Sequence, residues 1–161
     1  MSRFARRSFA TALLAAVALS PIATGSVASA ADTPTKKAGY TIAVKESKLG
    51  PILTDGTGMS LYMFTPDRRN VSNCEGPCLA AWPPVMLKDG EGLGDVVLEG
   101  NLRRSLLGVA MRFDGSRQVT YNGFPLYYWA RDRAAGDVTG QWVNGIWFVL
   151  NADGAPNTAR I

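Results

Sequence analysis

Hydrophobic and polar positions alternate with a period of two along much of the chain after residue 39, and turn residues break the pattern at short intervals. In residues 40–47, YTIAVKES, Ile42 and Val44 alternate with polar neighbours, as in a strand that is buried on one face. Seventeen glycines and nine prolines separate such runs. We therefore expect a mainly β fold with at most short helices.

Dipeptides that favour tight turns predict where the strands reverse. Asn-Gly pairs at 122–123 and 144–145 each lie between β-prone runs, which is the strongest short signal for a hairpin. An Asp-Gly pair at 55–56 has the corresponding place earlier in the chain. Residues 101–113, NLRRSLLGVAMRF, fit either a strand or a helix, and Gly108 counts mildly against the helix.

The most informative pattern is an internal repeat. The stretch SLYMFTPDRRN, residues 60–70, recurs 65 residues later as PLYYWARDRAA, and Trp82 and Trp147 lie at the same offset. Two units at this spacing are too few for a solenoid and predict two similar β units in one pseudo-symmetric domain. The aligned residues are Gly58, Leu61, Tyr62, Phe64 and Asp67 in the first copy and Gly123, Leu126, Tyr127, Trp129 and Asp132 in the second.

Alternation within each copy predicts which side chains share a face. Tyr62 and Phe64 should lie on one face of a strand, and Leu61 and Met63 on the other. The second copy repeats this arrangement, with Tyr127 and Trp129 on one face and Leu126 and Tyr128 on the other. Since both faces are apolar, we expect strands that are buried on both sides.

The aspartate of each copy follows the end of the predicted strand. An aspartate at such a turn, like Asp67 or Asp132, usually accepts N–H bonds from its own turn, and a buried tyrosine hydroxyl needs a partner. These properties favour a structural role for the motif. The alternative is that the Tyr and Asp clusters line a pocket for a polar ligand.

The motif and its surroundings resemble a known family. The pattern Y-x-[FWY]-x-x-D occurs as YMFTPD and YYWARD, with SNCEGPCLAAWPPV after the first copy and YNGFPLYYW and GDVTGQWVNGIWFVL around the second. Over about residues 40–150 the chain resembles the bacterial secreted-repeat or lipoprotein family that this motif defines. The resemblance implies an extracytoplasmic protein made of tandem repeats, and it implies no biochemical activity. Phe124 stands where similar chains often carry histidine, so no histidine-dependent metal binding is expected.

The N-terminus has the features of an export signal. Arg3, Arg6 and Arg7 precede an apolar run over residues 10–19, and a small-residue cleavage pattern follows at 28–30. The paired arginines are compatible with either the general or the twin-arginine export route. No cysteine lies at the cleavage region, which favours release over a lipid anchor. We expect a secreted or otherwise extracytoplasmic protein, in the periplasm or cell wall, after cleavage near Ala30.

These observations define the expected organisation of the chain. Loss of the three signal arginines lowers the net charge from +4 to +1, so the basic precursor gives no reason to expect a nucleic-acid partner. No second apolar run is long enough for a membrane span, and none is expected in the mature chain. The expected segments are a signal peptide (1–30), a flexible leader (31–39), a β domain (40–150, with repeats at about 50–87 and 115–150) and a tail (151–161).

The two cysteines form a second candidate site. Cys74 and Cys78, in CEGPC, are the only cysteines, and such a pair in an exported protein favours a disulfide whose short loop mainly shapes a turn. Pro77 suits the first position of a short helix, PCLAAW, which should end before Pro83. Cys78 would then lie in the first helical turn, where a free thiol has a lowered pKa. A redox or Cu(I) role is the alternative, although the chain lacks the histidine that completes such sites.

The complete lack of histidine limits the chemistry of the chain. It removes the most common general base and excludes Ser-His-Asp and Cys-His arrangements. We expect no enzymatic activity, no cofactor and no metal, and a role in binding an envelope component or in structural support. Binding of cell-wall polysaccharide is a further alternative, which expects Trp129 or Trp142 to be exposed beside another aromatic residue. A supporting role expects both to be buried.

Overall fold

The computed structural model describes residues 39–161, so the predicted signal peptide and the predicted leader up to residue 38 lie outside the described residues. Short strands dominate the described part, as the alternation predicted. The strands are β1 (Thr41–Ser47), β2 (Gly50–Asp55), β3 (Tyr62–Phe64), β4 (Val97–Leu98), β5 (Leu107–Met111), β6 (Arg117–Tyr121), β7 (Phe124–Pro125) and β8 (Trp147–Val149). The helical elements are α1 (Pro77–Ala81) and three 3-10 turns, η1 (Leu93–Asp95), η2 (Arg104–Leu106) and η3 (Val143–Gly145).

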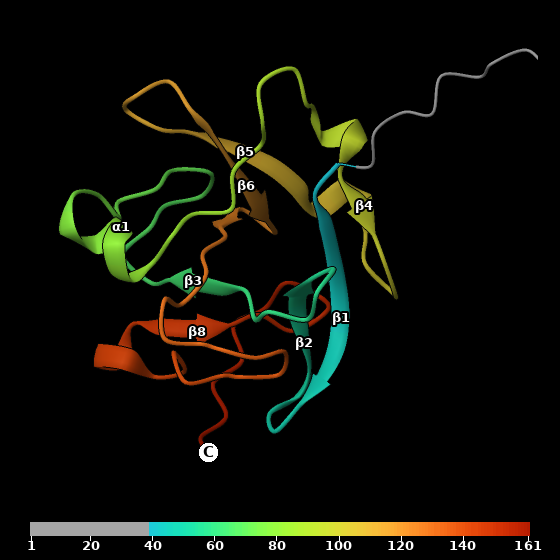
Figure 1. Cartoon of the computed structure of the whole chain (residues 1–161), viewed down its shortest axis with the longest axis vertical. Helices are drawn as coiled ribbons and strands as arrows, with labels where there is room; N and C mark the ends of the chain where they lie inside the picture. The colour runs from blue at the N-terminus through green and yellow to red at the C-terminus, as the bar shows by residue number, and fades with distance from the viewer. Residues whose placement is uncertain (1–38) are drawn as a thin grey trace, which may run out of the picture. The chain divides into compact units, whose positions relative to one another are not determined.

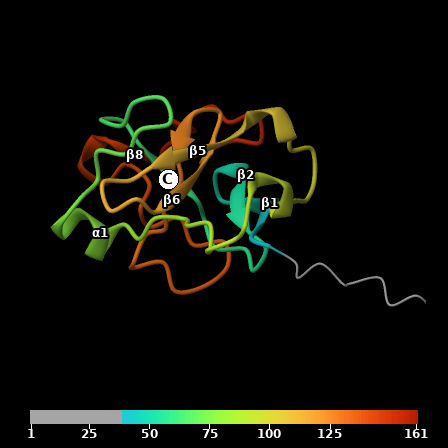
Figure 2. The same ribbon diagram turned by 90° about the horizontal axis from the view of Figure 1, so that it is seen from above.

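The described strands form three small sheets, with the orders β2-β1-β4, β3-β8 and β5-β6-β7. In Figure 1 the β5–β6 hairpin lies above the β3–β8 pair, and β1 runs along one side. Viewed from above, α1 lies toward one end of the molecule and the β1–β2 hairpin toward the other (Figure 2). The mainly β fold built from two repeats is therefore confirmed.

The two repeats begin with equivalent antiparallel hairpins, β1–β2 and β5–β6. The first hairpin closes with Ser47 opposite Gly50, which leaves a two-residue turn. The second closes with a hydrogen bond from the Arg112 N–H to the Ser116 carbonyl at 2.9 Å, which leaves a three-residue turn. Lys48 and Phe113, which lie at the 65-residue offset, are the first residues of these two turns.

The segment 101–113 is a strand preceded by a single 3-10 turn, which answers the question that its pattern left open. Gly108 lies in β5 because the neighbouring chain comes very close there. A Cβ atom at this position would lie 2.6 Å from Oγ1 of Thr120 and 3.0 Å from Oδ1 of Asn70. Residue size, rather than turn geometry, therefore requires glycine at this position.

The predictions for one turn and for the short helix are confirmed, and the prediction for a second turn needs a correction. The pair at 122–123 joins β6 to β7 with positive φ at both residues, as a tight hairpin requires. The helix predicted from PCLAAW is present as α1, with proline in its first turn. The pair at 144–145 also has positive φ at both residues, but it lies in η3 and only β8 follows it. No strand lies directly before this turn, because β7 ends at Pro125, so the hairpin predicted at 144–145 is wrong.

The core has two parts, which correspond to the two faces predicted for the motif strands. Leu61, Met63 and Leu126 belong to one buried cluster. Tyr62 and Tyr127 belong to the other. The alternation therefore assigned these side chains to the correct faces.

Candidate functional site

The motif tyrosines and aspartates are bonded between the repeats. The Tyr62 hydroxyl donates to Oδ2 of Asp132 at 2.7 Å. The Tyr127 hydroxyl donates to Oδ2 of Asp67 at 2.8 Å. The backbones of the two tyrosines also pair with each other, through N–H···O=C bonds of 2.8 and 3.0 Å. A local two-fold axis therefore runs between the tyrosines, and each tyrosine bonds to the aspartate of the other copy.

The first of these clusters, which we call the Asp132 corner, consists of Tyr62, Asp132 and Thr139. Oδ1 of Asp132 accepts the Thr139 N–H at 3.0 Å and its hydroxyl at 2.6 Å. The Gly140 N–H donates to the Tyr62 hydroxyl at 3.2 Å. Burial raises the pKa of the Asp132 carboxyl, against the effect of the bonds from Thr139 and Tyr62. Burial also raises the pKa of Tyr62, so its hydroxyl stays protonated and acts as a donor.

The second cluster, the Asp67 corner, consists of Tyr127, Asp67 and Ser72. Oδ1 of Asp67 accepts the Asn73 N–H at 2.6 Å. The oxygens of Ser72 and Tyr127 lie 2.8 Å apart, and the serine is the donor because the tyrosine proton goes to Asp67. Burial raises the pKa of Asp67 to about 6, although Asn73, Tyr127 and the charge of Arg112 act in the opposite direction.

A buried arginine that the sequence did not single out supports the Asp67 corner. Nη1 of Arg112 donates to the Ser72 hydroxyl and to Oε1 of Gln118, both at 2.7 Å. Its Nη2 donates to the Cys74 carbonyl at 2.8 Å and lies 3.9 Å from a Glu75 carboxylate oxygen. Arg112 is only 9% exposed. It therefore joins the β5–β6 hairpin of the second repeat to the cysteine loop of the first.

The motif aromatics stack in a row that also alternates between repeats. The Phe64 ring stacks on Trp147 with 4.2 Å between centroids. Trp147 stacks on Trp82 at 3.7 Å and 4°, and Trp82 packs against Trp129 at 4.1 Å. We call these four rings the aromatic ladder. Because neighbouring rings come from different copies, the ladder holds the two repeats together.

The polar atoms of the motif are used within the fold. In residues 39–161, every fully buried side-chain nitrogen or oxygen has a hydrogen-bond partner. Each motif aspartate accepts a backbone N–H from the loop that follows it and a hydroxyl from the other repeat. This arrangement favours a structural role for the Tyr and Asp residues over a ligand pocket.

The cysteine pair is a disulfide, as the export signal and the even count predicted. Cys74 and Cys78 are bonded, with 5.4 Å between their Cα atoms. Cys74 is fully buried, and Cys78 is half-buried. The bond closes the loop whose Cys74 carbonyl receives Arg112. It therefore shapes the surface on which the β5–β6 hairpin rests.

Trp129 and Trp142 match neither of the two expectations for them, because both are half-buried. The Arg131 guanidinium lies 5.6 Å from the Trp129 ring. Trp142 is covered by the Arg160 guanidinium at 4.0 Å, and its indole N–H donates to the Ala159 carbonyl. Arginine side chains thus occupy the places at these rings where a sugar would stack.

Two small hollows lie where a hairpin of one repeat meets the loop after the motif of the other. The first, the Phe113 hollow, has a volume of about 120 Å³ and is lined by Glu75, Gly76, Leu79, Arg112, Phe113 and Asp114. The second, the Lys48 hollow, has a volume of about 90 Å³ and is lined by Lys48, Gly136, Asp137, Val138, Thr139 and Ile161. The two hollows share one pair of corresponding residues, Lys48 and Phe113, and their other lining residues do not correspond.

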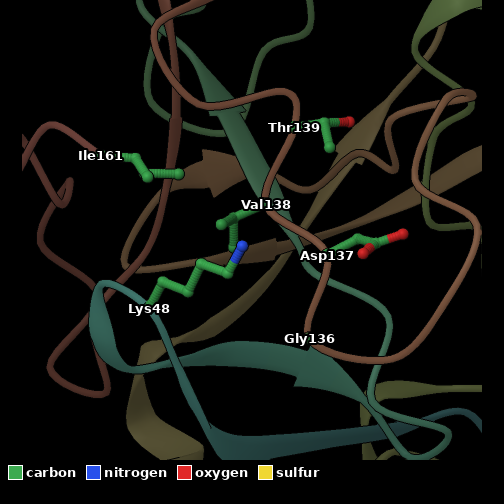
Figure 3. Close-up of a pocket in the computed structure, with 6 residues that line it drawn as sticks. All are labelled: Lys48, Gly136, Asp137, Val138, Thr139 and Ile161. Carbon is green, nitrogen blue, oxygen red and sulfur yellow. The ribbon is translucent and has the colours of Figure 1, made fainter.

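The Lys48 hollow carries its own positive charge. Figure 3 shows the Lys48 side chain extending from the β1–β2 turn toward Val138, whereas the Asp137 carboxylate points away. That carboxylate accepts the N–H groups of Arg133 and Ala134, both at 2.8 Å. The Asp137 carboxylate therefore stabilises the loop in which it lies, whereas the Lys48 ammonium group lies at the hollow.

The tips of the two hairpins differ sharply in polarity. Met111 is 63% exposed and Phe113 is 91% exposed. The equivalent residues of the first hairpin, Glu46 and Lys48, are exposed and charged. Sequence reasoning missed Phe113, although a comparison of the two copies beyond the motif would have shown the exchange of charged for apolar residues.

Two further properties of the described residues bear on the other hypotheses. Within residues 39–161, no group of three or more cysteine or acidic side chains is placed to hold a metal ion. None of the helices in this part of the chain is long and apolar enough to cross a membrane.

Comparison with known proteins agrees with the internal repeat. Residues 43–86 and 108–151 each match one family, Lipoprotein_15, described as a secreted repeat of unknown function. The two matches are offset by 65 residues, as the motif is. No curated protein and no solved structure matches the chain. The paired hairpins, the bonds between repeats and the two matched segments together show that the chain belongs to this family of secreted repeats.

Proposed function

We propose that this protein is a non-enzymatic binding module of the cell envelope, and that the tip of the β5–β6 hairpin is its contact surface. The observation that carries this proposal is the exchange of Glu46 and Lys48 for Met111 and Phe113 at equivalent positions. The first hairpin forms with charged residues there, so the fold does not require apolar ones. Exposed apolar side chains that stability does not need are typical of interaction sites.

The chemistry of the two side chains supports contact with another macromolecule. Aromatic residues and methionine are enriched in protein interfaces, and methionine adapts to partners of different shape. Met111 is the last residue of β5, and Phe113 is the first residue of the turn that follows, so both lie at the tip of the hairpin. They form a small apolar surface that extends beyond the body of the domain.

The surrounding structure supports the hairpin as a fixed platform. Arg112, between the two exposed residues, is buried and bonded to Ser72, Gln118 and Cys74. The disulfide fixes the loop that receives it. A contact surface that is already ordered loses little conformational entropy on binding.

Two alternatives receive less support from the structure. A thiol or copper function would use Cys74 and Cys78, which are bonded to each other, and Cys74 is fully buried. Polysaccharide binding through Trp129 or Trp142 would require a free ring face, and an arginine lies against each ring. Both alternatives therefore rank below contact through the hairpin tip.

The test exchanges residues between the two hairpins. The double variant Met111→Glu, Phe113→Lys gives the second hairpin the residues of the first. We expect it to melt like the parent but to bind a purified envelope fraction at least tenfold more weakly in a sedimentation assay. Glu46→Gln, Lys48→Gln is the matched control and should bind like the parent. Equal binding by all three proteins would overturn the proposal.

A further inference from the structure

The Phe113 hollow is small and is lined by both apolar and acidic side chains. We propose that it binds the cationic side chain, arginine or lysine, of an extended segment of a protein partner. This inference rests on the proposed function, because it names the chemistry of the partner at the same hairpin tip.

The size of the hollow fits one side chain. Its volume is about 120 Å³. Pockets for whole small molecules usually have volumes of about 300–1,000 Å³. A single long side chain that enters from a partner is therefore the more suitable occupant.

The walls of the hollow suit the two parts of such a side chain. Leu79 and Phe113 supply apolar surface, against which the methylene groups of lysine or arginine can pack. The Phe113 ring is 91% exposed, so its face is free to attract a cation. The backbone at Gly76 adds no side chain to the space.

The charges around the hollow favour a cation. Glu75 and Asp114 each contribute one negative charge to its rim, and Arg112 contributes one positive charge. The guanidinium N–H groups of Arg112 donate to Ser72, Gln118 and the Cys74 carbonyl, and its Nη2 also lies 3.9 Å from the Glu75 carboxylate. The rim therefore has a net charge of −1, with its positive member buried. This charge also disfavours an anionic membrane surface as the partner.

The Lys48 hollow provides an internal comparison. Lys48 lies at the sequence position that corresponds to Phe113, so a charged side chain replaces the aromatic ring at this hairpin. The charged side chains that line this hollow, Lys48 and Asp137, sum to zero, so it lacks the net negative charge that should attract the ligand. We therefore expect a cationic probe to bind at the Phe113 hollow and not at the Lys48 hollow.

The first experiment uses a minimal probe, the acetylated and amidated dipeptide of arginine and leucine, added to the ¹⁵N-labelled exported protein. We expect amide shifts at Glu75, Gly76, Leu79, Phe113 and Asp114, and none around Lys48. The same dipeptide with citrulline, which has nearly the same shape but no charge, should bind at least fivefold more weakly. Higher salt should weaken the arginine probe, since the rim is exposed.

Variants assign the effect to the hollow. Phe113→Ser and Glu75→Gln should each weaken binding of the arginine dipeptide at least threefold, and Lys48→Ala, the matched control, should leave it unchanged. Absence of shifts at the hollow, or equal binding of the citrulline dipeptide, would overturn the inference.

The two proposals can fail separately. If the hairpin exchange abolishes envelope binding but the arginine dipeptide does not bind the hollow, the proposed function stands and this inference falls. If the dipeptide binds the hollow and the exchanged protein still binds the envelope, the inference is supported and the proposed function falls.

Discussion

The Asp132 corner and the Asp67 corner have the same central bond but different surroundings. In each, a buried tyrosine donates to the aspartate of the other repeat at 2.7 or 2.8 Å. The second carboxylate oxygen of Asp132 is bonded by the hydroxyl and the N–H of one residue, Thr139. The second carboxylate oxygen of Asp67 accepts only the Asn73 N–H. Hydrogen bonds through Ser72 connect Tyr127, the donor to Asp67, with Arg112.

The difference shows that a repeated motif does not fix the behaviour of its residues. Asp132 is supported by neutral hydrogen bonds, whereas the Asp67 corner contains a buried positive charge. Both carboxyls have a raised pKa because both are buried, and Asp67 reaches about 6. The neighbours therefore determine how each corner contributes to stability, and four predictions test this comparison.

The largest effect should come from the centre of the aromatic ladder, which both corners share. Trp82→Ala and Trp147→Ala should each lower the free energy of unfolding by about 3–5 kcal/mol, because each removes a buried indole that contacts rings of both repeats. Urea denaturation measures both losses. We expect them to agree within about 1 kcal/mol, and a much larger difference would contradict the equivalence of the two copies.

The next effect should be confined to the Asp67 corner. Arg112→Met keeps the aliphatic stem but leaves the acceptors on Ser72, Gln118 and Cys74 without their donor, so we expect a loss of about 2–4 kcal/mol. Ser47, at the equivalent position, bonds only within its own turn. Ser47→Ala should therefore cost less than about 1 kcal/mol. Similar losses in urea unfolding for the two variants would show that the corners do not differ in this way.

The aspartates themselves should have a smaller effect. Asp132→Ala removes the acceptor of Tyr62 and Thr139 and should destabilise the fold by about 1–3 kcal/mol. Asp67→Ala should cost less, because Asp67 is more exposed and has fewer bonds at its second oxygen. Thermal unfolding compares the two variants. An unchanged melting temperature in both variants would contradict a structural role for the motif aspartates and would favour a binding role.

The smallest effect is a dependence of stability on pH. Since the folded state raises the pKa of Asp67 to about 6, the native protein holds this proton more tightly than the unfolded chain. Its contribution to stability is complete below about pH 4 and is lost as the pH rises through about 6. We expect a loss of roughly 1–2 kcal/mol after allowance for solvent screening. Asp67→Asn should flatten this slope in urea unfolding between pH 4 and 7, and an unchanged slope would exclude Asp67 as its source.

The fold could be predicted from the sequence where local rules decide. Alternation placed Leu61 and Tyr62 in different core clusters, and the turn at 122–123 formed as its residues required. At 144–145 the same dipeptide gave the expected backbone but no hairpin, because residues 141–142 form no strand. The residues of a turn determine its backbone conformation. A strand, however, forms only where another strand pairs with it, and the local sequence does not specify that pairing.

The candidate surface depended on information that local patterns lack. The motif indicated that Tyr62 and Asp67 act together, but it could not show that the bonds cross between copies. Arg112 was hidden in a segment whose pattern fitted a strand or a helix, and its burial depends on acceptors about 40 residues away. Phe113 resembles a core residue in sequence, and only the structure shows that it is 91% exposed.

The crossed bonds also relate this domain to a pair of associated subunits. A tyrosine whose acceptor lies on the other copy has the connectivity of a two-fold homodimer whose subunits are joined by a linker. Residues 87–107 form that linker here, and β4 within it pairs with β1 of the first copy. A chain with one copy would satisfy its tyrosine, its aspartate and its half of the ladder only by pairing with a second chain. The internal repeat thus places within one molecule the kind of contact that a homodimer makes between two.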